Sequence, residues 1–162
     1  MMIHSDLIYG RDSRNRIDAS REPDIGGARE LIETFYYAFN ARDLDTFSLV
    51  WADHALIQLN NPLGGIIRGH AEISALYRRI FSGAAHVWVE LTDIVEFQSR
   101  QMVVFAGRET GAFTHRGETL ALQIRTSRVV QWLGPETGWR QVHHHGSIDD
   151  PLLLSAYQSA VK

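Results

Sequence analysis

The second half of the chain contains four successive long runs of β-branched and aromatic residues, and no other feature limits the possible folds as strongly. Residues of these types favour strands, and the short connectors between the runs favour hairpins. A four-stranded antiparallel meander is therefore predicted. Its strands should cover His86–Phe97, Gln101–His115, Thr119–Leu133 and Trp139–Ile148.

The first half of the chain has helical periodicity instead. Apolar residues recur at spacings of three and four over residues 24–42 and again over 69–83, which predicts two amphipathic helices. Asp43 is a favourable N-cap for a short helix that would form a hairpin with the first. Residues 55–59 predict a short strand, and residues 60–65 predict a turn.

Helices followed by long strands make an α+β plan, in which one face of the sheet is buried on the helices. A curved antiparallel sheet wrapped around the long N-terminal helix forms a cone. The open mouth of a cone is a natural small-molecule pocket, and its outer face is free to pair with a second copy of the chain. With 162 residues and 44% hydrophobic content, the chain fits one such domain, which we place at residues 24–150.

Two segments flank this domain. Residues 1–23 have the polar composition of a loose arm, in which the apolar group Leu7-Ile8-Tyr9 is expected to anchor the arm to the body or to a partner chain. Pro151 ends the last predicted strand. Residues 151–162 are expected to form a C-terminal tail, either as a short helix or as an extended segment.

Composition narrows the class of protein. The net charge of −3 gives no field that would attract nucleic acid or an anionic membrane. The absence of cysteine excludes disulfides and thiolate catalysis. No stretch approaches the roughly 20 apolar residues of a membrane span, and the first residues lack the apolar run of a signal peptide. We therefore expect a cytoplasmic protein with neither a nucleic-acid nor a membrane partner.

The last predicted strand carries three consecutive histidines. Because side chains alternate between the faces of a strand, His143 and His145 should share one face and His144 should point to the other. Trp139 and Ser147 fall on the face of the first pair, where a histidine could handle a proton beside a ligand. A metal would need further ligands that the sequence offers only at distant positions, so we expect no metal and no cofactor.

Arg108 and Arg128 lie on neighbouring predicted strands, each in a largely apolar lane. An unpaired buried charge is very unfavourable, so each guanidinium needs a partner. Two guanidiniums converging on one concave face would bind a carboxylate through paired hydrogen bonds. The alternative is that both pair with internal acids such as Glu90 or Asp93.

Three segments at the junctions of these elements are residues 39–47 (FNARDLDTF), 51–55 (WADHA) and 68–73 (RGHAEI). Together with the order of elements, they resemble the nuclear transport factor 2-like superfamily, including the SnoaL-like proteins. The closing run Trp139–Ser147 (WRQVHHHGS) is similar to the Trp-x-x-Val-His-x-His-x-Ser strand of the association (hub) domain of calcium/calmodulin-dependent protein kinase II. The resemblance covers roughly residues 25–149 and implies a cone-shaped α+β barrel that is usually dimeric.

The resemblance also implies where a ligand would bind. Arg108 and Arg128 fall where the hub pocket has arginines, whereas Gly146 stands where the hub has a further basic residue. The resemblance therefore does not imply that this chain has the ligand preference of the hub.

Superfamily enzymes such as the ketosteroid isomerases combine a carboxylate base with a tyrosine donor in an apolar cavity. By that analogy Asp53, at the helix-to-strand junction, is a candidate base. Tyr36, Tyr37 and Tyr77 are candidate donors or ligand-binding residues. The alternative is that Asp53 only caps or braces the helical hairpin.

Two functions remain open. The first is a SnoaL-like small-molecule-binding protein, such as an isomerase, cyclase or hydrolase-type enzyme, acting on a small acidic or carbonyl-bearing ligand. The second is a non-catalytic oligomerisation domain, as the hub resemblance suggests, that forms a homodimer or a larger homo-oligomer. A deep open cavity would favour the first function, and a filled barrel would favour the second.

Overall fold

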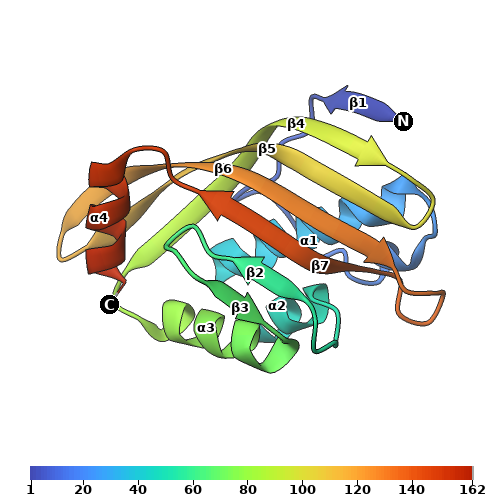
Figure 1. The fold of residues 1–162 in the computed structure, drawn as a ribbon, viewed down its shortest axis with the longest axis horizontal. Coiled ribbons are helices and arrows are strands. Elements are labelled where there is room, and N and C mark those ends of the chain that lie inside the picture. Colours follow the sequence, from blue (N-terminus) through green and yellow to red (C-terminus); the bar gives the residue numbers. More distant parts are fainter. Residues whose placement is uncertain (162) are drawn as a thin grey trace.

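The computed structural model describes residues 1–161, which form seven strands, four α-helices and one short 3-10 helix. All seven strands lie in one sheet in the order β1-β4-β5-β6-β7-β2-β3 (Figure 1). In chain order the elements are β1 (Met2–Ser5), η1 (Ala19–Arg21), α1 (Ile25–Ala41), α2 (Leu44–Val50), β2 (Gln58–Asn60), β3 (Ile66–Arg68), α3 (His70–Ser82), β4 (His86–Gln98), β5 (Met102–His115), β6 (Glu118–Trp132), β7 (Trp139–Ser147) and α4 (Pro151–Ala160).

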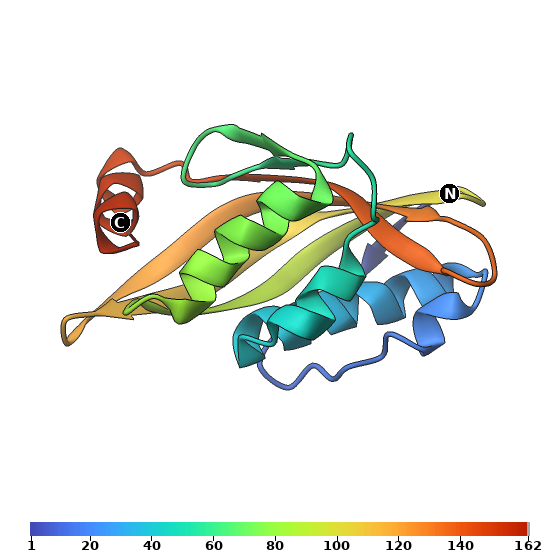
Figure 2. The ribbon, with the colours of Figure 1, turned by 90° about the horizontal axis from the view of Figure 1, so that it is seen from below.

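The predicted antiparallel meander is confirmed, because β4, β5, β6 and β7 pair in succession. β1 extends the sheet beyond β4, and β2 and β3 extend it beyond β7. Figure 2 shows α1 and α2 on one side of the curved sheet. We call the side that packs on α1 the inner face and the opposite side the outer face. The α+β class, with a curved sheet around a long N-terminal helix, is confirmed.

Three helices begin after an aspartate whose side chain accepts a backbone hydrogen bond. Asp24 caps α1, Asp43 caps α2 and Asp150 caps α4. The Oδ1 atom of Asp43 lies 3.0 Å from the backbone nitrogen of Thr46, so the predicted N-cap is confirmed. Such a cap satisfies a backbone donor that the first turn of a helix leaves without a partner.

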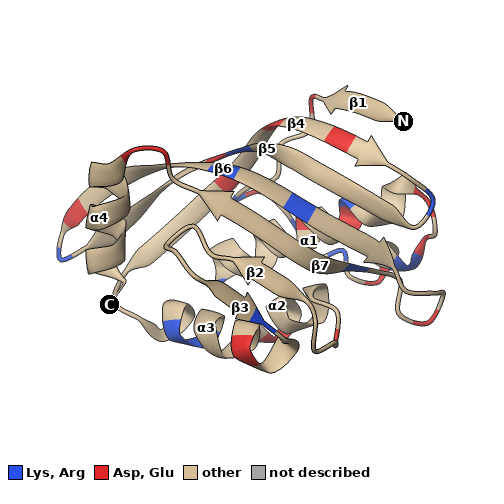
Figure 3. Ribbon diagram, viewed as in Figure 1, with Lys and Arg blue, Asp and Glu red and all other residues tan. Residues whose placement is uncertain are grey.

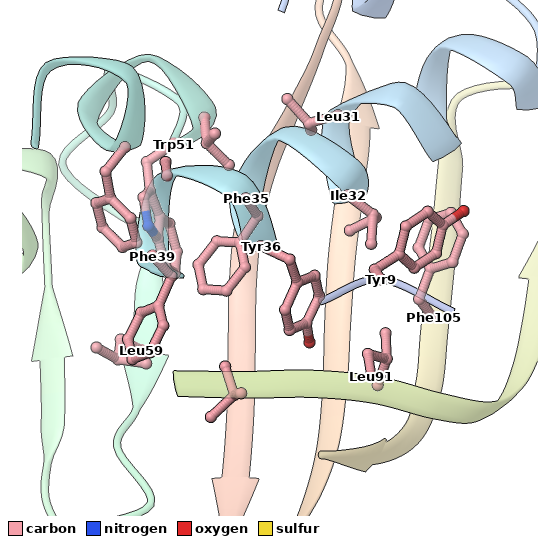
Figure 4. Close-up of a cluster of buried hydrophobic side chains, with 14 of the residues drawn as sticks. Tyr9, Leu31, Ile32, Phe35, Tyr36, Phe39, Trp51, Leu59, Leu91 and Phe105 are labelled. Carbon is pink, nitrogen blue, oxygen red and sulfur yellow. The ribbon is translucent and has the colours of Figure 1, made fainter. Parts of the chain in front are cut away.

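The core is centred on α1. Its buried side chains pack between the inner face of the sheet and the arm, as Figure 4 shows. Each large apolar side chain that is fully buried stabilises the fold by about 1.5–3 kcal/mol. Those from α1 that are at most 1% exposed are Leu31, Ile32, Phe35 and Tyr36.

The N-terminal arm is more ordered than its composition predicts. β1 pairs antiparallel with the end of β4, and a bridge joins Tyr9 to Leu91. Tyr9 is 6% exposed and its ring stacks on Tyr36, whereas Leu7 and Ile8 are exposed. Of the expected anchor group Leu7-Ile8-Tyr9, only Tyr9 is buried, and the pairing of β1 with β4 is a second attachment of the arm.

The other differences from the sequence-based prediction are local. The strand expected at residues 55–59 lies at Gln58–Asn60, and the short strand Ile66–Arg68 was not predicted. The C-terminal tail is helical over Pro151–Ala160. In Figure 1 this helix lies across one end of the sheet, next to the hairpin of β5 and β6.

Candidate ligand-binding site

A β-bulge in β7 decides which histidine faces the inside of the barrel. The neighbouring residues Val129 and Val130 of β6 pair with residues 143 and 141 of β7, so Val142 is an extra residue in β7. An extra residue reverses the alternation of side chains beyond it. The pattern that places Trp139 and Gln141 on the inner face therefore places His144 there as well.

The predicted placement of the three histidines is wrong for this reason. His144 is 2% exposed on the inner face. His143 and His145 instead bond to β2: the Nδ1 atom of His143 lies 2.9 Å from the carbonyl oxygen of Gln58, and that of His145 lies 3.1 Å from Nδ2 of Asn60. Neither His143 nor His145 lies on the inner face of the barrel, so neither can act there as an acid or base.

His144 is held as a neutral imidazole. Its Nε2 atom lies 2.8 Å from Oγ1 of Thr126, and its Nδ1 atom has no hydrogen-bond partner among residues 1–161. Burial, and then the positive charge of Arg128, lower the pKa of His144 well below its ordinary value of 6.5. The ring therefore carries no charge at neutral pH.

Arg128 is the centre of a buried polar cluster. It is 1% exposed, and its NH2 atom donates to Oε1 of Glu109 at 2.7 Å. Its Nε and NH1 atoms donate to the Tyr36 hydroxyl at 3.0 Å and to Oε1 of Gln141 at 3.1 Å. The guanidinium carbon lies 3.5 Å from the centre of the Phe35 ring. The Tyr36 hydroxyl in turn donates to Oε1 of Glu109 at 2.5 Å.

This cluster answers the question of what neutralises Arg128. The partner is an internal carboxylate, as in one of the two alternatives, but the acid is Glu109 and not Glu90 or Asp93. Burial alone would lower the pKa of Arg128, but Tyr36 and Glu109 raise it above its ordinary value. The guanidinium therefore stays charged and has no excess positive charge to offer a ligand.

Arg108 does not converge with Arg128, and that prediction is wrong. Arg108 is exposed on the outer face of β5, where its cross-strand neighbour on β6 is Arg125. Arg128 lies opposite Phe105, whose side chain is fully buried on the inner face. The antiparallel register pairs odd-numbered residues of β5 with even-numbered residues of β6, and both of these sets point inward. Arg128 therefore faces the inside of the barrel, whereas Arg108 faces the outside.

A small cavity of about 40 Å³ lies beside this cluster. Pockets that bind small molecules are typically about 300–1,000 Å³, so this volume holds only a few water molecules. The barrel is nearly filled, which by the criterion stated above favours an oligomerisation domain, and a ligand can bind inside only if the cavity opens further. Its lining includes Phe35, Phe39, Asn61, Pro62, Leu63, Tyr77, Ile80, Val89, Glu109, Ile124, Arg128, His144 and Tyr157.

Besides Nδ1 of His144, three polar groups of the cavity wall have free hydrogen-bonding capacity. Both hydrogen bonds of the Glu109 side chain use Oε1, so within residues 1–161 its Oε2 atom has no partner. The hydroxyls of Tyr77 and Tyr157 also lack a partner in that part of the chain. Burial raises the pKa of Tyr77 to about 12, so its hydroxyl remains a proton donor at neutral pH. The cavity thus places a carboxylate oxygen and two phenols in apolar surroundings.

The remaining predicted site residues lie elsewhere. Asp53 is exposed in the loop before β2, outside the cavity. Trp139 donates from its indole to the carbonyl oxygen of Glu22 at 3.0 Å and lines a wider cleft of about 590 Å³ at the opposite end of the barrel. Ser147 accepts a hydrogen bond from Nε of Arg125 at 3.2 Å. Of the predicted set, only Tyr36, Tyr77 and Arg128 belong to the cavity or to the cluster beside it.

Gly146 packs closely against the loop between β2 and β3. A Cβ atom on Gly146 would lie 2.9 Å from Cγ of Pro62, which belongs to this loop. The proline ring therefore leaves no room for a side chain at position 146. This loop closes one side of the cavity.

Sequence reasoning overlooked two residues of the site. Glu109 lies in the same lane as Val103, Phe105 and Phe113, and a carboxylate in an apolar lane was a signal that could have been matched to Arg128. Tyr157 gave no such signal, because the tail could not be assigned to either face of the barrel from its sequence.

Among the described residues 1–161, no three His, Asp or Glu side chains gather in a way that could hold a metal ion. No helix in the same range is long and apolar enough to span a membrane.

The curved α+β barrel is the fold of cystatin-like and nuclear transport factor 2-like proteins, as the sequence resemblance implies. Residues 28–151 match the model of the SnoaL-like domain family, and the chain therefore belongs to that family. No protein with curated annotation matches the chain significantly.

Solved structures agree with this assignment. A proposed calcium/calmodulin-dependent protein kinase type II association domain from Thiobacillus denitrificans is 28% identical, with a TM-score of 0.61, over 75% of this chain and 94% of that one. A proposed dehydratase of the NTF2-like family from Streptomyces avermitilis is 19% identical, with a TM-score of 0.69, over 77% and 96%. A ketosteroid isomerase-like protein from Erwinia carotovora atroseptica is 15% identical, with a TM-score of 0.63, over 76% and 94%. The resemblance found in the sequence is confirmed.

Proposed function

We propose that this protein binds a small, uncharged, carbonyl-bearing molecule in the inner cavity and moves a proton next to the carbonyl group. The observation that carries the proposal is the free Oε2 atom of Glu109, which shares an apolar cavity with the free hydroxyl of Tyr77. A carboxylate that accepts a proton and a phenol that stabilises the developing oxyanion are the two groups such chemistry needs.

The charges of the cluster favour a carbonyl compound over an acid. Arg128 is already neutralised by Glu109, so a carboxylate ligand would bring an unbalanced negative charge into a buried site. A neutral ketone brings no such charge and accepts a hydrogen bond from Tyr77. In this role Glu109 takes a proton from the carbon beside the carbonyl, and the neutral ring of His144 contributes no charge of its own.

A thermal-shift screen of polycyclic ketones and small carboxylates tests the proposal. A ketone that binds the folded state should stabilise it by about 2.7 kcal/mol at a hundredfold excess over Kd, whereas carboxylates should have no effect. Glu109→Gln should reverse this preference, because Arg128 then has no counter-charge. Solvent exchange of the hydrogens beside the ketone carbonyl, followed by NMR in D2O, should fall by about 10²–10⁴ in this variant.

Glu90→Gln provides the matched control, since Glu90 lies on the outer face of β4 and should change neither preference nor exchange. Wild-type protein that is stabilised by carboxylates as strongly as by ketones would contradict the proposal. Solvent exchange beside the ketone carbonyl that persists in Glu109→Gln would also contradict it.

A second function, homo-oligomerisation, is favoured by the outer face of the sheet. Figure 3 shows few charged residues along β5, β6 and β7. Phe97 and Met102 are each 42% exposed on this face, next to the paired residues Val104 and Val129. We call these four residues the outer apolar patch. Exposed apolar patches of this kind commonly mark interfaces between proteins, and a second copy would cover this one.

Light scattering tests the second function. The wild-type protein should be at least a dimer at micromolar concentration, and Val129→Lys should shift it to a monomer, because a lysine in a buried interface loses its hydration. Leu49→Lys, on the exposed side of α2, is the control and should leave the oligomer intact. A monomeric wild-type protein would rule out the outer apolar patch as an interface.

A further inference from the structure

The tyrosine of the C-terminal helix closes the cavity. Tyr157 is the buried residue of α4, at 6% exposed, and its side chain forms part of the cavity wall. Its ring stacks on Phe113 of β5 with 4.8 Å between the ring centres and 30° between the planes. No hydrogen bond from its hydroxyl is found within residues 1–161. A side chain of the C-terminal helix therefore forms part of the wall of the small cavity.

Tyr157 lines the same cavity as Tyr77 and Glu109. Burial, and then the negative charges that Tyr77 and Glu109 can carry, raise the pKa of Tyr157 above its ordinary value, so its phenol stays protonated at neutral pH. Tyr157 thus combines a ring stacked on Phe113 with a phenol in the cavity that holds the two groups we assign to ligand chemistry.

The tail is attached to the body by few polar contacts. One hydrogen bond joins Nε2 of Gln158 to the carbonyl oxygen of Leu63 at 2.7 Å. On the other side of α4, Leu152 is 82% exposed. The loop that accepts the bond contains Gly64 and Gly65, whose positive φ angles of 105° and 87° suit glycine. Moving α4 away breaks no strand pairing; it exposes the ring of Tyr157 and the partly buried apolar side chains of α4 that pack on the core, Leu153, Leu154, Ala156 and Ala160.

We propose that Tyr157 occupies the ligand's place and that α4 leaves it when a ligand binds. The ligand class follows from what Tyr157 places in the cavity: a planar ring of about the size of a phenol, with a hydroxyl or carbonyl oxygen, in the cavity that Tyr77 and Glu109 also line. Displacing the ring of Tyr157 also explains how a cavity of about 40 Å³ becomes large enough for a ligand. This inference rests on the proposed function of the same cavity.

Hydrogen exchange of the full-length wild-type protein tests the displacement. The probe is 4-methylphenol, which is the tyrosine side chain as a free molecule. At saturating probe, backbone amides of α4 should exchange at least fivefold faster, while those of β5 keep their protection. The comparison compound is 4-methylcyclohexanol, which has the same heavy atoms without a planar ring and should leave α4 protected.

Calorimetry on Tyr157→Ala tests the ligand class. Without its own ring in the site, the variant should bind 4-methylphenol at least tenfold more tightly than the wild-type protein does. Tyr9→Ala is the matched control, because Tyr9 is equally buried but stacks on Tyr36 in the arm. Compared with the wild-type protein under the same conditions, Tyr9→Ala should neither bind 4-methylphenol more tightly nor show faster exchange in α4.

Three results would overturn the inference: α4 that stays protected in the wild-type protein at saturating probe, equal gains in Tyr9→Ala and Tyr157→Ala, or equal binding of the non-planar alcohol. Should Tyr157→Ala fail to fold, the exchange experiment on the wild-type protein decides alone. Ketones that bind in a Glu109-dependent way while α4 stays protected would remove the displacement and leave the proposed function standing. If the probe releases α4 but solvent exchange beside the ketone carbonyl does not depend on Glu109, the displacement stands and the proposed function is removed.

Discussion

Arg128→Leu is expected to lower the free energy of unfolding by about 3–5 kcal/mol, because the variant leaves Glu109 as an unpaired charge inside the barrel. The side chains of Arg128 and Glu109 are 2% and 4% exposed, so bulk water does not solvate the charge that loses its partner. The Tyr36 hydroxyl and the Gln141 side chain lose a donor at the same time. Urea unfolding followed by tryptophan fluorescence measures the change.

The double variant Arg128→Leu with Glu109→Leu shows whether the charge is the cause. Removing both partners leaves no unpaired charge, so the double variant should be more stable than Arg128→Leu alone. Arg108→Leu is the matched control on the neighbouring strand. Since Arg108 is exposed on the outer face, its loss should change stability by less than about 0.5 kcal/mol. Similar losses in the two arginine variants would refute the assignment of Arg128 to a buried ion pair.

Stability is expected to fall by about 1.4 kcal/mol for each pH unit below 6.5, because His144 resists protonation in the folded state. Above pH 6.5 the ring is neutral in both states and contributes no pH dependence. Below pH 6.5 the unfolded chain takes up a proton that the folded chain excludes, which favours unfolding. The loss continues until the pH reaches the lowered pKa of the folded state. Urea unfolding at several pH values between 7.5 and 5 measures the slope.

His144→Gln should remove this part of the slope, since glutamine does not titrate. His86→Gln is the control, because His86 is exposed at the start of β4 and its loss should leave the slope in place. A slope that is unchanged in His144→Gln would show that other groups cause the acid sensitivity.

Much of the fold could be predicted from local patterns. The β-branched runs gave the four long strands within a few residues, since strand preference and short connectors act locally. The spacing of apolar residues gave α1 and α3, and Asp43 gave the start of α2. An anchor in the arm was predicted, but the pairing of β1 with β4 was not, because composition cannot reveal which strand a segment joins.

The candidate site was predicted less well, and the cause is geometric. One extra residue at Val142 exchanged the faces of His143 and His144, and simple alternation cannot show where a bulge occurs. The antiparallel register separated Arg108 from Arg128 and placed Glu109 beside the latter. Such pairings depend on which residue of one strand lies opposite which residue of the next.

The amino-acid pattern by itself determined the helices, the long strands and the need for a partner to Arg128, because each follows from the preferences of nearby residues or from the cost of burying a charge. Only the tertiary structure decided that Glu109 is this partner, that His144 faces inward and that Tyr157 closes the cavity. Contacts between distant segments depend on register, on a bulge and on the packing of the tail, and these are properties of the assembled sheet and not of any single stretch of the chain.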